Sequence, residues 1–128
     1  MGESSTLTIL SIGLHPSVVD FSPYPGQNEA TLTARIVAGE AALRAAGFDF
    51  VTCLVSTAPD EAEAKVREYA AKGLFRAVMI GAGVRMAPEH TLLFERLVNV
   101  VHEMLPSAKF CFNTSPETTV DAFRRWVD

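Results

Sequence analysis

The sequence is short of the features that mark several specialised classes of protein. Among its 128 residues are only two cysteines, Cys53 and Cys111, and a domain of this length buries a core without disulfide support. Acidic residues outnumber basic ones, 15 to 11, and the basic residues form no run, whereas nucleic-acid binding needs clustered Lys and Arg. No apolar run approaches the roughly 20 residues that cross a membrane. We therefore expect neither a nucleic acid nor a membrane as a partner.

Signals for export and for metal binding are also missing. Residues Met1–Ser5 carry neither a basic segment nor a long apolar stretch, so we expect no signal peptide and a cytoplasmic protein. The cytoplasm keeps thiols reduced, and both cysteines fall in apolar runs, which predicts two buried, free thiols. The three histidines and two cysteines show no paired ligand spacing, so no metal site is expected.

Short apolar runs alternate with amphipathic segments along the whole chain. The runs predict strands over residues 7–12, 50–55, 77–80 and 110–112. Helices are predicted from the N-cap Asn28 to residue 46, from the acidic turn at 58–61 to Gly73, over 88–105, and from Ser115 to Trp126. Strands alternating with helices form parallel sheets covered on both faces. Residues 1–128 are therefore predicted to be one flavodoxin-like α/β domain, a three-layer sandwich with four parallel strands in the order 2-1-3-4.

This strand order predicts where a ligand would bind. In an open parallel sheet, ligands bind beyond the carboxyl ends of the strands, where the strand order reverses, which here lies between the first and third strands. The long connection at 13–28 fits this position, because loops of that length are usually functional. The candidate residues follow the first, third and fourth strands: Gly13, His15 and Ser17; Gly81, Gly83 and Arg85; Asn113 and Thr114.

The stretch from Gly81 to His90 has the chemistry of an anion site. Gly81 and Gly83 have no side chain to block a ligand, and the following helix would add partial positive charge at its N-terminus. Arg85 carries donors that can hold a carboxylate or phosphate bidentately. The alternative is that the two glycines only allow a tight turn and that Arg85 is solvated.

Two histidines are candidates for acid–base chemistry. His15 follows the first strand, and His90 would lie in the first turn of the helix at 88–105. The alternatives are that His15 bonds to its own turn and that His90 faces solvent. We therefore carry two hypotheses: a protein that binds a small anionic or carbonyl-containing molecule, with His15 or His90 as catalytic residues, and a non-catalytic ligand sensor or dimeric scaffold.

The nucleotide-binding signatures are absent, and the sequence identifies no cofactor. The first strand is followed by Gly13 alone rather than by three spaced glycines, and no P-loop or nucleophile elbow occurs. The predicted order resembles that of flavodoxins and response-regulator receivers. Receivers carry acidic residues where this chain has Gly13 and Gly81, and flavodoxins carry a hydroxyl-rich phosphate loop that the first connection lacks.

A closer resemblance covers most of the chain after residue 20. The segments 80–85, 89–103 and 111–114 resemble those of a family of small bacterial and fungal proteins. The resemblance implies a flavodoxin-like fold, and since no activity is established for that family, it implies no reaction.

The predicted helix at 88–105 is apolar around much of its perimeter. One face carries Leu93, Leu97, Val100, Val101 and Met104, and further apolar residues lie away from that face: Leu92, Phe94, Val98 and Leu105. A second buried surface would account for them, which predicts a homodimer through this helix. The alternative is that neighbouring helices of one chain shield each other.

Overall fold

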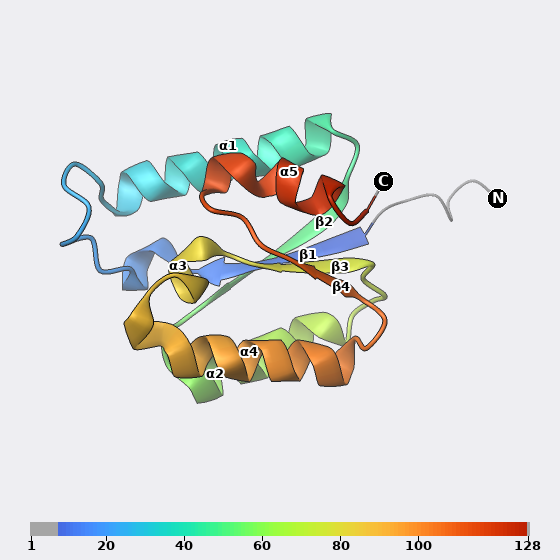
Figure 1. Ribbon diagram of the computed structural model, residues 1–128. Coiled ribbons are helices and arrows are strands. Elements are labelled where there is room, and N and C mark those ends of the chain that lie inside the picture. Colours follow the sequence, from blue (N-terminus) through green and yellow to red (C-terminus); the bar gives the residue numbers. More distant parts are fainter. Residues whose placement is uncertain (1–7, 128) are drawn as a thin grey trace.

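A computed structural model describes residues 8–127 and has three layers (Figure 1). The middle layer is a parallel sheet of four strands: β1 (Thr8–Leu14), β2 (Asp49–Val55), β3 (Ala77–Ile80) and β4 (Lys109–Cys111). Helices α1 (Glu29–Ala45) and α5 (Thr119–Arg124) cover one face, and α2 (Pro59–Ala70) and α4 (Thr91–Met104) cover the other. The order β2-β1-β3-β4 confirms the predicted fold. The expectations for Met1–Ser5 and for Leu7 lie outside the described residues.

The two faces of the sheet bury separate cores, because side chains alternate along each strand. Ile12, Val78 and Leu97 belong to the core under α2 and α4, and none of their surface is exposed. Ile9 and Phe123 belong to the smaller core under α1 and α5. Within residues 8–127, no helix combines the length and the apolar character needed to cross a bilayer.

Local signals set both ends of α1 as predicted. The Asn28 side chain accepts from the backbone N–H of Thr31 at 2.9 Å, and the Thr31 hydroxyl oxygen accepts from the backbone N–H of Asn28 at 2.8 Å. Gly47 ends the helix with φ of 88°, a conformation that glycine adopts without steric strain. The first strand is longer than predicted, since β1 runs to Leu14, so Gly13 lies inside the strand rather than after it.

The helix predicted over 88–105 is shorter, and other helical turns precede it. A four-residue turn, α3 (Ala82–Arg85), follows β3 directly, and a 3-10 turn spans Pro88–His90 before α4 begins at Thr91. Pro88 explains the interruption, because proline pushes the preceding residue out of the helical region, and Ala87 is extended with φ −99° and ψ 116°. His90 therefore lies in the 3-10 turn and not in the first turn of a long helix.

The apolar perimeter of α4 is largely covered within one chain. Phe94 packs against Phe112 with ring centroids 6.2 Å apart, Val98 packs on the core, and Leu105 is 8% exposed. Of the four apolar residues outside the main stripe, only Leu92 is well exposed, at 72%. Shielding by neighbouring elements of the same chain thus accounts for most of the apolar residues of α4, and a homodimer is not needed to explain them.

We expect Leu97→Ala to lower the free energy of unfolding by about 2–5 kcal/mol, because it opens a cavity in the core under α4. Leu92→Ala on the same helix is the matched control and should change it by less than about 0.5 kcal/mol. Urea unfolding followed by circular dichroism measures both. Equal losses in the two variants would contradict this packing of α4.

Candidate functional site

A cavity of about 520 Å³ lies between α1 and the carboxyl-terminal half of the sheet. Its walls come from the ends of β1, β2 and β3, the loop at 19–27, α3 and the segment 113–116 that follows β4. This is the edge at which the strand order reverses, as the sequence predicted.

The floor of the cavity is the α1 side of the sheet, where β1 carries small residues. Ser11 pairs in register with Thr52 and Met79, and Gly13 pairs with Leu54. A Cβ built on Gly13 would meet only the Leu54 Cδ2 atom, at 3.9 Å. Larger side chains on this central strand would fill the space, so Ser11 and Gly13 keep it open.

The roof of the cavity is one stripe of α1 with three- and four-residue spacing: Leu32, Arg35, Ile36, Gly39, Glu40 and Leu43. Of the residues of α1, only Leu43 is fully buried, so the helix packs tightly against the sheet near its C-terminal end alone. Two charged residues, Arg35 and Glu40, stand in this inward stripe.

Glu40 gives the cavity a polar end. Its Oε2 atom accepts from the Thr52 hydroxyl at 2.7 Å, and Thr52 lies beside Ser11 in the sheet. Within residues 8–127, no Lys, Arg or His forms an ion pair with Glu40. The carboxylate is therefore half-buried with one hydroxyl donor as its partner.

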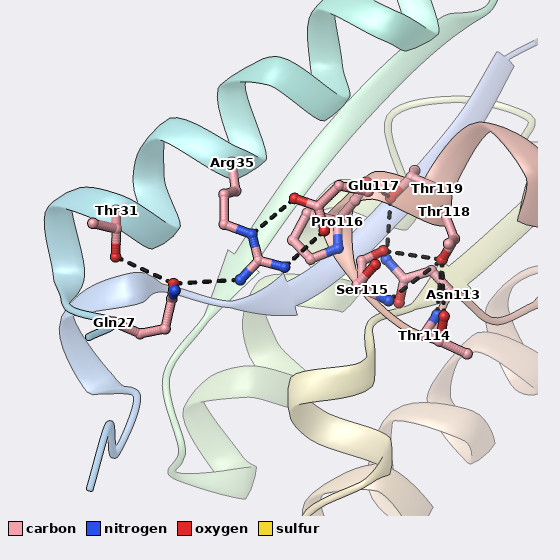
Figure 2. Close-up of polar contacts among 10 residues, drawn as sticks. All are labelled: Gln27, Thr31, Arg35, Asn113, Thr114, Ser115, Pro116, Glu117, Thr118 and Thr119. Atoms are coloured by element: carbon pink, nitrogen blue, oxygen red, sulfur yellow. Dashed lines mark hydrogen bonds and ion pairs between the residues drawn. The ribbon is translucent and has the colours of Figure 1, made fainter. Parts of the chain in front are cut away.

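Arg35 joins α1 to the segment after β4. Its Nε and Nη2 atoms donate to the two carboxylate oxygens of Glu117 at 2.8 and 2.7 Å, and Nη1 donates to Gln27 Oε1 at 3.4 Å (Figure 2). Nearby, the backbone oxygen of Pro116 lies 3.1 Å from where a Cβ of Gly39 would stand, so the two segments approach closely. The hydrogen bonds from Arg35 lower the pKa of Glu117 from 4.5 to about 2.

We expect Glu117→Gln to lower the stability at neutral pH, because it removes a bidentate ion pair. The folded-state pKa of Glu117 is depressed, so its contribution is complete above pH 4.5 and is lost as the pH falls through about 2. The gap in melting temperature between wild type and variant should therefore close across that window. Glu95→Gln, at an exposed position on α4, should show no such window, and a gap independent of pH would contradict the assignment.

Asn113 fastens the end of β4 to two helical segments. Its Oδ1 atom accepts from the Ala82 N–H at 2.9 Å, and the residue is 6% exposed. Its Nδ2 atom donates to the Thr119 hydroxyl at 3.1 Å (Figure 2). Both ends of the amide are thus engaged. The side chain therefore bridges two segments, and the residue also lines the cavity.

We expect Asn113→Ala to lower the free energy of unfolding by about 1–3 kcal/mol, because it leaves the Ala82 N–H without its partner and removes a buried donor to Thr119. Thr114→Ala is the neighbouring control. It removes only an exposed hydroxyl, so its effect should stay within about 0.5 kcal/mol. Chemical unfolding of the two variants compares them, and equal effects would rule out the bridging role.

Arg85 does not line the cavity. Its Nη2 atom donates to the Asn113 backbone oxygen at 2.7 Å, and its guanidinium lies over the Phe112 ring, 5.4 Å from the centroid. Phe112 packs on the core under α4, so Arg85 is directed to the opposite side of the sheet from the cavity. Its buried Nε atom has no hydrogen-bond partner among the described residues.

The candidate residues divide into two groups in space. Gly13, Gly81, Gly83, Asn113 and Thr114 line the cavity.

His15, Ser17 and His90 lie outside the cavity. The His15 Nδ1 atom accepts from the backbone N–H of Ser17 at 3.1 Å and lies 2.8 Å from the Ser17 hydroxyl, which is the bond to its own turn that the sequence allowed. Both residues line a separate, shallower hollow with Glu61 and Lys65. His90 lines neither space.

The two cysteines are buried and free. Burial raises the pKa of Cys53 to about 11 and that of Cys111 to about 12, so both are thiols at neutral pH and neither is an activated nucleophile. In the part of the chain that the structure describes, no three His, Cys, Asp or Glu side chains gather where they could hold a metal ion.

Four polar residues of the cavity were not predicted from the sequence. Arg35 and Glu40 lie on α1, and Ser11 and Thr52 lie on the strands below it. The available signal was the pair of charges in the apolar stripe of the first helix, at positions that would otherwise face a core.

Comparisons with known proteins bear on the fold alone. No protein-family model matches this chain, and no curated protein matches it. Among solved structures, the chain is similar to a de novo designed Rossmann-fold protein, with a TM-score of 0.52 and 15% identity over 96% of this chain and 99% of the design. The comparisons support a Rossmann-like α/β fold and give no support to the resemblance to a bacterial and fungal family.

Proposed function

We propose that this protein binds a small, largely apolar molecule in the cavity between α1 and the sheet. The observation that carries the proposal is a space of about 520 Å³ at the point where the strand order reverses. Small-molecule sites typically occupy 300–1,000 Å³ and occur at this place in open α/β sheets.

The lining supports a mostly apolar ligand. Leu32 and Ile36 from α1 face Leu54 and Met79 from the sheet, and Phe21 adds an aromatic ring from the loop at 19–27. Burial of apolar ligand surface against these side chains would supply most of the affinity.

Binding is better supported than acid–base turnover. Neither His15 nor His90 lines the cavity, and the thiols of both cysteines are protonated at neutral pH. The anionic ligand expected from the sequence depended on Arg85 together with the backbone amides of Gly81 and Gly83. The Arg85 guanidinium lies against Phe112 on the other side of the sheet, and the Gly81 N–H is already bonded to the Ile12 backbone oxygen. The proposal therefore keeps the small-molecule site and leaves out the anion and the proton transfer.

Filling the cavity tests this proposal. Gly13→Leu places a side chain on the cavity floor, where only Leu54 is near, and relieves the cost of a glycine in a strand. We expect it to raise the free energy of unfolding by about 1 kcal/mol and to abolish binding of apolar fragments such as indole and benzyl alcohol. Amide chemical shifts locate the fragments, and in the wild type the shifts should centre on Ser11, Gly13, Thr52 and Gly81.

Gly73→Ala is the control, because a Cβ there meets nothing within 4 Å and the position is remote from the cavity. It should bind the fragments as the wild type does. Fragments that bind Gly13→Leu unchanged, or that shift only residues near His15 or His90, would refute the proposal. Failure of every fragment at millimolar concentration would refute it as well.

A further inference from the structure

We infer that the ligand of this cavity carries a primary ammonium group, which Glu40, Thr52 and Ser11 receive at the polar end. The inference rests on the proposed function and specifies the chemistry of its ligand. It comes from the contacts of Glu40 and from the arrangement of the three side chains around it.

Glu40 is a half-buried carboxylate that forms no ion pair with any of residues 8–127. It stands in the inward stripe of α1, and its single hydrogen-bond partner among those residues is the Thr52 hydroxyl, at 2.7 Å. Removing a carboxylate from water is unfavourable unless an opposite charge or several donors compensate it. Among residues 8–127, the Thr52 hydroxyl is the one donor to Glu40, and no Lys, Arg or His forms an ion pair with it.

Another half-buried glutamate shows how this chain compensates such a charge. Glu63 on α2 has a side chain that is 24% exposed, and it pairs with Arg67 at 2.7 Å and with Arg96 at 2.9 Å. Arg35 shares the inward stripe with Glu40, but its guanidinium is held by Glu117. The protein thus supplies two cations to Glu63 and none of its described cations to Glu40.

The three acceptors at this end match the three donors of an ammonium group. Ser11 and Thr52 are register partners on neighbouring strands, whose backbones lie about 4.8 Å apart, and Glu40 reaches down to Thr52 from the helix above. The Ser11 hydroxyl forms no hydrogen bond with another described residue, and the second carboxylate oxygen of Glu40 is likewise unoccupied by them. An ammonium has three N–H donors and no acceptor, so it can satisfy all three side chains together.

The rest of the cavity fits a hydrocarbon or aromatic body attached to that amine. The apolar residues lie beside the polar end on both walls, with Ile36 one turn before Glu40 on α1 and Leu54 two residues after Thr52 on β2. A carboxylate on the same body would be repelled by Glu40 as a like charge. An alcohol would lack the positive charge that compensates the Glu40 carboxylate. The net charge of −4 also favours the approach of a cation.

Three probes with one carbon skeleton test the inference: hexylamine, 1-hexanol and hexanoate, titrated at pH 7 and followed by amide chemical shifts. We expect hexylamine to bind about tenfold more tightly than 1-hexanol, and hexanoate to bind least. Glu40→Gln keeps an acceptor for Thr52 but removes the charge, so it should abolish the preference for the amine and leave the affinity for 1-hexanol nearly unchanged. Glu29→Gln, at the exposed start of the same helix, should preserve the preference.

The outcomes separate this inference from the proposed function. If 1-hexanol shifts the cavity amides and hexylamine binds no more tightly, the cavity is a site but not for an amine, and the inference fails alone. A preference for hexylamine that persists in Glu40→Gln also overturns it. If no probe shifts the amides of Ser11, Gly13 and Thr52, the inference and the proposed function both fail.

Discussion

The cavity depends on how α1 is held over the sheet. A parallel sheet must be covered on both faces, and α1 provides most of the cover on one of them. The helix is anchored near its C-terminal end by Leu43 and further toward its N-terminus by Arg35, which binds Glu117. Between these anchors the opposing strand carries Ser11 and Gly13, which are too small to reach the helix. The helix therefore covers the sheet but leaves a space between itself and the strands.

The two faces of the sheet differ in how completely they are packed. Under α2 and α4 the apolar core is continuous, and Arg67 and Arg96 tie the two helices together through acidic partners such as Glu63 and Glu103. Under α1 the apolar core is smaller and ends at Met79, beyond which polar and small residues begin. Because the core under α2 and α4 is the larger of the two, the domain can keep a cavity under α1 and still fold.

Sequence periodicity predicted the strands, their order and the edge at which the cavity lies, because these depend on local patterns and on the handedness of the connections. Asn28 and Gly47 were predictable for the same reason. The directions of individual side chains were not. Arg85 lies at the expected edge, but a one-turn helix after β3 directs it to Phe112, and Pro88 moves His90 into a separate turn. The sequence did not predict that Glu40 lines the cavity, because this depends on where the axis of α1 lies above the sheet.

The helix α1 is held over the sheet by Leu43 and by the exposed Arg35–Glu117 ion pair, and this arrangement has a consequence for the evolution of the domain. Residues of the inward stripe, such as Ile36 and Glu40, touch the cavity more than they touch the folding core. Substitutions there would change the shape and charge of the cavity while leaving the opposite face of the sheet intact. The residues of the main core are therefore largely separate from those that line the cavity, so under the proposed function related chains with the same sheet could differ in specificity through one face of α1.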